Sequence, residues 1–158
     1  MGYNAFALIY RPGLQTACED LARAISFIFE HAEDFEVDID CYSLWGGSAG
    51  ARMAAYLGAC GPAYFGGEDL PKPGTVVMQY TGYDEYSEND PPTYACVGTN
   101  DGIANWRDIR QRIQAMNALG IPTEFHAYEG LRHGFGLGTG TVAEGWIYDA
   151  VAFWEKQM

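Results

Sequence analysis

Residues 46–50 of the chain read Gly-Gly-Ser-Ala-Gly, a G-x-S-x-G pattern with Ser48 at its centre. The run at 39–45 before it is typical of a strand, and the run at 51–57 after it is typical of a helix. A serine on such a sharp turn needs glycines on both sides, because the backbones approach closely and the φ/ψ angles are strained. The turn exposes the hydroxyl and points the helix N-terminus at the group that the hydroxyl attacks. The pattern predicts that Ser48 is a nucleophile, although a serine at a helix start is otherwise usually a cap.

A nucleophilic serine needs partners, because its hydroxyl is unreactive until a neighbouring base takes the proton. His133, within Leu-Arg-His-Gly-Phe-Gly, is the candidate base, since imidazole can accept that proton and return it to a leaving group. Asp101, within Thr-Asn-Asp-Gly, is the candidate acid that orients the imidazole. The alternatives are a turn or capping residue for Asp101 and a solvated loop histidine for His133.

The other two histidines fit the role of base less well. His31 ends a predicted helix, where a cation is favoured in any case, and His126 lies within a predicted strand and not at its end. No set of histidines and cysteines has the spacing of metal ligands, so we expect no metal.

Strands and helices alternate along the predicted chain. We expect strands at residues 6–10, 38–45, 75–80, 93–98 and 122–128, and helices at 14–31, 48–60, 103–119 and 141–156. This alternation implies an α/β fold with a mainly parallel sheet of about five strands and flanking helices, in a single domain over residues 1–158. The carboxyl ends of parallel strands meet at one edge of a sheet, so Ser48, Asp101 and His133 are expected there together. Five aromatic residues are also expected near that edge, as an acyl or sugar pocket or as ordinary surface and core residues: Tyr80, Tyr83, Tyr86, Trp106 and Phe135.

Composition excludes several other classes of function. The 158 residues are 48% hydrophobic and 19% charged, which is a globular composition. The net charge of −12 argues against nucleic acids and anionic membrane surfaces as partners, because both require clustered cations.

The N-terminus has no basic segment followed by a long apolar stretch, so we expect no secretory signal and a cytoplasmic location. No apolar run approaches the length of a membrane span. The four cysteines show no C-x-x-C spacing and are expected to be buried free thiols, with Cys41 and Cys96 inside strands.

The order nucleophile, acid, base is the chain order of the α/β-hydrolase fold. The chain resembles bacterial α/β-hydrolase esterases of the acetyl-esterase and acetylxylan-esterase type. The segments that match are Gly-Tyr-Asn-Ala-Phe at 2–6 with Tyr10-Arg11, Leu-Trp-Gly-Gly-Ser-Ala-Gly at 44–50, Val-Gly-Thr-Asn-Asp at 97–101, and His-Gly-Phe-Gly at 133–136. The resemblance implies hydrolysis of a small carboxylic ester without a cofactor, with Ser48, Asp101 and His133 as the triad. It also implies that the backbone N–H of Ala49 is an oxyanion-hole donor.

One departure concerns the N-terminal region. Members of that family carry a His-Gly-Gly motif upstream of the Tyr-Asn-Ala-Phe segment, and this chain contains no His-Gly-Gly. We therefore expect a truncated α/β-hydrolase fold, an activity weakened by a missing oxyanion donor, and a homo-oligomer that covers the apolar surface left exposed.

Three functions stay open at this point. The first is a serine hydrolase of short-chain carboxylic esters, with acetylated carbohydrates among its candidate substrates. The second is a peptidase of the same fold, which amide turnover would distinguish. The third is a catalytically impaired fragment that acts as an interaction module, which the missing motif favours.

Overall fold

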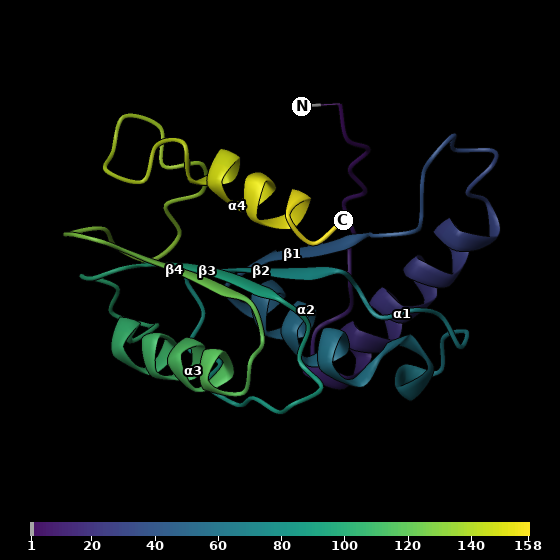
Figure 1. The fold of residues 1–158 in the computed structure, drawn as a ribbon, viewed down its shortest axis with the longest axis horizontal. Coiled ribbons are helices and arrows are strands. Elements are labelled where there is room, and N and C mark those ends of the chain that lie inside the picture. The colour runs from purple at the N-terminus through teal and green to yellow at the C-terminus, as the bar shows by residue number, and fades with distance from the viewer. Residues whose placement is uncertain (1) are drawn as a thin grey trace.

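The computed structural model describes residues 2–158. Its centre is a parallel sheet in the order β1-β2-β3-β4. Three helices cover one face of the sheet and the fourth covers the other face (Figure 1). The strands are β1 (Ser43–Gly47), β2 (Thr75–Gln79), β3 (Thr93–Gly98) and β4 (Thr123–Tyr128). The helices are α1 (Leu14–Glu30), α2 (Ala49–Cys60), α3 (Trp106–Ala118) and α4 (Trp146–Glu155), with a short 3₁₀ helix at Pro62–Phe65.

The two central strands are buried on both faces, which explains their nearly continuous apolar sequence. Successive side chains point to opposite faces of a sheet. Val76 and Met78 of β2 accordingly join the core with α1, α2 and α3, whereas Val77 packs with α4. The sheet is therefore a rigid platform between two helical layers, and its carboxyl edge is free to carry a site.

The alternation of strands and helices, and the parallel sheet, are confirmed. β3 has the predicted bounds, and β2 and β4 differ by one residue each. β1 is shorter than predicted and begins only at Ser43, so Cys41 lies before the strand and not inside it. Cys96 does lie in β3, and all four cysteines are free thiols. Cys18 and Cys96 are buried as expected, whereas Cys41 and Cys60 are only partly buried.

The predicted first strand at residues 6–10 is wrong, and the sheet has four strands where about five were expected. The segment pairs with no strand of the sheet. Its apolar side chains remain exposed, Phe6 by 52% and Ile9 by 98%, and only Leu8 packs against the core. A short apolar run becomes a strand only where a sheet edge accepts its hydrogen bonds, and the run alone does not provide that edge.

No helix among residues 2–158 is long and apolar enough to cross a membrane.

Candidate active site

Ser48 is the single residue between the end of β1 and the start of α2. Its backbone has φ 53° and ψ −117°, a conformation that non-glycine residues rarely adopt. The N–H of Ser48 donates to the carbonyl oxygen of Gln79 at 2.9 Å, and the carbonyl oxygen of Ser48 accepts from the N–H of Arg52 at 3.2 Å. The neighbouring strand and the helix therefore hold Ser48 in this strained conformation.

The two outer glycines of the motif play different parts. A Cβ atom on Gly46 would lie 2.2 Å from the carbonyl carbon of Gly50, so only glycine fits at position 46. A Cβ atom on Gly50 would have no atom within 4 Å. The expectation that the turn needs glycine on both sides of the serine is thus wrong for Gly50. Gly46 packs closely against the backbone atoms of Gly50, but a side chain on Gly50 would point into open space.

The structure brings Ser48, His133 and Asp101 together in one chain of hydrogen bonds. The Nε2 atom of His133 lies 2.9 Å from the hydroxyl of Ser48, and its Nδ1 atom lies 2.8 Å from Oδ2 of Asp101. A carboxylate can only accept, so Nδ1 carries the hydrogen toward Asp101 and Nε2 is left to accept from Ser48. This is the tautomer that a histidine needs in order to act as a base toward a serine.

The side chain of Asp101 is held in place by burial and by backbone hydrogen bonds. This side chain is fully buried, and Oδ1 accepts the backbone N–H groups of Ile103 and Ala104, both at 2.8 Å. Oδ2 is thereby directed at His133, whose own side chain is 21% exposed and so remains open to a substrate. The turn that Asp101 makes with its own backbone was the alternative to an acid role, and the structure shows that the two are compatible.

The loop that carries His133 is anchored by residues that the sequence did not single out. The carbonyl oxygen of Gly136 accepts from the side-chain amide of Gln79 at 2.5 Å and from the indole N–H of Trp146 at 2.9 Å. Gln79 therefore contacts both halves of the site, since its backbone carbonyl also holds Ser48. The sequence feature that could have pointed to Gln79 is its position, because it is a polar residue at the carboxyl end of an otherwise apolar buried strand.

A cavity of about 470 Å³ opens beside Ser48 and His133. Ala49, the first residue of α2, lines it, and the first N–H groups of a helix have no acceptor within the helix. Six consecutive residues, 80–85, form another part of the wall, and Arg52 and Ile103 complete the lining.

The five aromatic residues that were expected near this edge have different positions. Tyr80 and Tyr83 line the cavity. Phe135 packs behind Tyr80 with ring centroids 5.2 Å apart, and Tyr80 itself meets the His133 ring edge-on at 5.0 Å. Trp106 and Tyr86 are not among the lining residues; Trp106 stacks with Arg107 on the surface of α3, and Tyr86 is exposed.

The remaining histidines lie in other surroundings. His126 bonds to Glu124 at 2.8 Å, and its ring stacks with that of Tyr94. His31 follows α1, and its Nδ1 atom lies 2.9 Å from the carbonyl oxygen of Phe27. Within residues 2–158, no three histidine, cysteine or acidic side chains are grouped as metal ligands would be.

Comparison with solved structures identifies the fold of the chain. A carboxylesterase from Lactobacillus plantarum superposes with a TM-score of 0.75 at 18% identity, over 90% of this chain and 68% of that one. An alpha/beta hydrolase enzyme from a deep-sea metagenome library of the Medee basin gives 0.73 at 19% identity, over 90% and 64%. The fold is that of the α/β hydrolases.

Another α/β-hydrolase neighbour is an acetyl ester-xyloside bifunctional hydrolase from Caldicellulosiruptor lactoaceticus, with a TM-score of 0.70 at 20% identity, over 87% of this chain and 66% of that one. The chain spans about two thirds of the length of these three structures. The BD-FAE family model matches residues 5–69, and no curated protein matches the sequence. At these identities the likeness establishes the fold, and the activity has to be argued from the site itself.

Proposed function

We propose that the chain is a serine hydrolase that cleaves short-chain carboxylic esters through an acyl-enzyme. The observation that supports this most directly is the hydrogen-bond chain from Ser48 through His133 to the buried Asp101, at the wall of an open cavity. Structural neighbours described as a carboxylesterase and as an acetyl ester-xyloside hydrolase support the same class of reaction.

The proposed reaction begins when Ser48 attacks the ester carbonyl carbon and His133 takes the hydroxyl proton on Nε2. The resulting oxyanion is stabilised by the N–H of Ala49 at the N-terminus of α2. His133 then gives its proton to the leaving alcohol, and the acyl group stays on Ser48. Finally, His133 takes a proton from a water molecule, which attacks the acyl carbon of the acyl-enzyme. His133 then returns that proton to the oxygen of Ser48 as the bond to the acyl group breaks and the acid is released.

The cavity favours a small ester with a polar alcohol. Its volume of about 470 Å³ lies at the lower end of the range for small-molecule sites. The residues that line it include Tyr80, Thr81, Asp84 and Glu85, whose side chains are of the types that bind the hydroxyl groups of a carbohydrate. Acetylated carbohydrates are therefore the substrates that we propose to test first.

The decisive experiment is labelling by a fluorophosphonate probe, followed by intact-mass measurement. The wild type is expected to gain one phosphonyl group and Ser48→Ala none, because only a serine activated by a base reacts at an appreciable rate. Ser26→Ala is the matched control, since its hydroxyl bonds the carbonyl oxygen of Ala22 on α1 and is not part of the cavity. Labelling of neither the wild type nor the control would contradict the proposal and favour an interaction module.

Turnover by unlabelled wild-type protein then distinguishes an esterase from a peptidase. We expect turnover of p-nitrophenyl acetate and none of the corresponding p-nitroanilide. Faster turnover of the anilide would instead assign the site to a peptidase.

A further inference from the structure

The loop between β2 and β3, residues 80–92, forms much of the cavity wall without any regular secondary structure. A loop of this length has no internal hydrogen-bond ladder to fix it. Contacts from elsewhere in the fold must therefore define the shape of the cavity beside Ser48.

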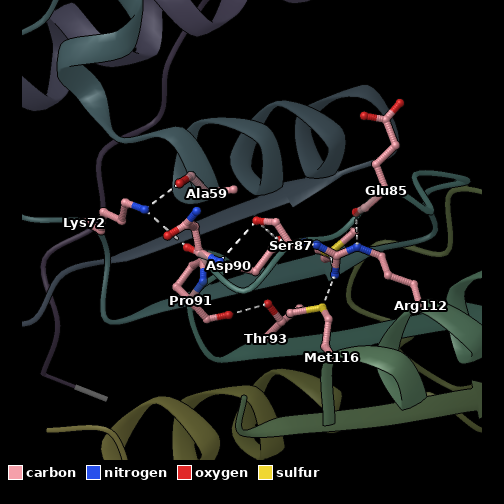
Figure 2. Close-up of polar contacts among 11 residues, drawn as sticks. Ala59, Lys72, Glu85, Ser87, Asp90, Pro91, Thr93, Arg112 and Met116 are labelled. Carbon is pink, nitrogen blue, oxygen red and sulfur yellow. Dashed lines mark hydrogen bonds and ion pairs between the residues drawn. The ribbon is translucent and has the colours of Figure 1, made fainter. Parts of the chain in front are cut away.

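Arg112 of α3 supplies such contacts from beneath the loop. Its side chain is fully buried, and the guanidinium bonds Oδ1 of Asp90 at 2.5 Å and the carbonyl oxygen of Glu85 at 2.8 Å. Asp90 in turn accepts the backbone N–H of Ser87 at 2.7 Å. Figure 2 shows this network between the helix and the loop.

A separate contact holds the same loop at Asn89, near its C-terminal end. Lys72 donates to the carbonyl oxygens of Asn89 and of Ala59, at the end of α2 (Figure 2). Arg112 thus holds the loop at Glu85 and at Asp90, and Lys72 holds it at Asn89.

Tyr83 lies between this buried network and the cavity. Its ring centroid is 5.6 Å from the guanidinium carbon of Arg112 on the buried side and 5.6 Å from that of Arg52, which lines the cavity. Burial raises the pKa of the Tyr83 hydroxyl to about 12, so this side chain is uncharged at neutral pH. Tyr83 is only 9% exposed, so its side chain has little freedom to move away from the wall.

A buried ion pair is a costly way to fill space beneath a loop. Burying two charges loses their hydration, and apolar side chains of the same volume often stabilise a protein as well or better. What apolar residues cannot do is hold a carbonyl oxygen and a carboxylate at defined positions. The pair of Arg112 and Asp90 therefore fixes the positions of these loop atoms, in addition to filling the space beneath the loop.

We propose that Arg112 is a positioning residue that, through Glu85 and Asp90, fixes Tyr83 as a wall of the cavity and thereby limits the size of the acyl group that Ser48 accepts. The proposal rests on the ester hydrolysis proposed above. It assigns substrate selection to a residue that is not part of the triad or of the cavity lining.

The test requires a variant that still folds. Arg112→Met alone would leave the Asp90 carboxylate buried without a partner, which is strongly destabilising. The double variant Arg112→Met with Asp90→Leu removes both charges at similar volume. Arg110→Met is the matched control, because this arginine lies on the same helix but is exposed and stacks on Trp106. Tyr83→Ala removes the wall directly.

The measurements are steady-state kinetics on p-nitrophenyl acetate and p-nitrophenyl hexanoate, and hydrogen exchange of residues 81–88. In the double variant, exchange of this segment should rise, and the preference for acetate over hexanoate in kcat/KM should fall roughly tenfold. The change should come from a lower KM for hexanoate, with kcat for acetate nearly unchanged, because the triad itself is intact. Tyr83→Ala should likewise lower the KM for hexanoate and the preference for acetate, and Arg110→Met should behave as the wild type.

Two results would overturn the proposal. Unchanged exchange would show that the ion pair does not hold the loop. Raised exchange with an unchanged preference would reduce Arg112 to a purely structural role. A wild type that hydrolyses neither ester would refute the proposed function instead, and hydrogen exchange would still decide whether Arg112 holds the loop.

Discussion

Ser48 and Tyr80 are two non-glycine residues with positive φ, 53° and 39°, and both lie directly after neighbouring strands at the candidate active site. A residue in such a conformation costs about 1–3 kcal/mol and persists only where its surroundings over-determine it. Here, the N–H of Ser48 is held by Gln79, and that of Tyr80 by the carbonyl oxygen of Cys96. Glu36 is a further residue of this kind, away from the site, but Ser48 and Tyr80 both lie where the hydroxyl must project from the sheet, and their strain there points to a functional origin.

The carboxylate of Asp101 can be tested at the same scale by Asp101→Asn. The new amide would still accept the N–H groups of Ile103 and Ala104 through its oxygen, so the fold should be kept. Its NH₂ group would face Nδ1 of His133 and favour the tautomer in which Nε2 carries the hydrogen and cannot accept from Ser48. We expect kcat for p-nitrophenyl acetate to fall by roughly 10³–10⁴, with a small change in KM.

The control for this substitution is the melting temperature, which should remain close to that of the wild type. A variant that melts normally and keeps full kcat would remove Asp101 from the proposed mechanism.

At the scale of elements, the turn from β1 to α2 depends on one close approach. Gly46 lies against the backbone of Gly50 and Ala51, whereas Gly50 faces open space. The G-x-S-x-G pattern therefore combines one glycine that the packing requires with one that it tolerates.

We expect Gly46→Ala to destabilise the protein by about 1–3 kcal/mol, because its Cβ would overlap backbone atoms that cannot move without opening the turn. The matched change Gly50→Ala should leave stability unchanged or raise it by up to about 1 kcal/mol, since alanine favours a helix. Urea unfolding measures both, and fluorophosphonate labelling reports whether Ser48 is still activated. Equal losses from the two variants would contradict this account of the turn.

At the scale of the whole molecule, an exposed aromatic cluster lies on the α1 side of the sheet. Phe6, Phe27 and Phe35 are 52%, 52% and 39% exposed, and the Phe35 ring centroid lies 5.5 Å from that of Phe6 and 6.0 Å from that of Phe27. Contiguous exposed apolar side chains often mark a contact with another protein. This cluster is a surface that a homo-oligomer would cover, so the expected homo-oligomer can be tested there.

We expect sedimentation to give a mass above the 17.4 kDa of one chain, because self-association would bury this cluster. Phe27→Lys should shift the distribution toward the monomer. Tyr148→Lys, at an exposed aromatic residue of α4 on the opposite face of the sheet, serves as the control and should change nothing. A wild type that sediments as a monomer at all accessible concentrations would contradict the oligomer.

Local patterns were sufficient to predict most of the elements and the grouping of the candidate triad. The buried run at Thr93–Gly98 can be read without knowing its neighbours, because a strand covered on both faces is apolar throughout. The meeting of Ser48, Asp101 and His133 follows from parallel strands alone, since each residue comes after a strand and the strand ends share an edge.

Contacts between distant parts of the chain decided the rest. Residues 6–10 have the pattern of a strand but no strand pairs with them, and a strand does not exist without its partner. Gln79 and Arg112 look like ordinary polar positions in a strand and a helix, and their roles emerge only when Gly136 and Asp90 come within hydrogen-bonding distance. Sequence periodicity encodes which face of an element is buried. The partner that a buried polar group finds on that face is determined by the assembled tertiary structure.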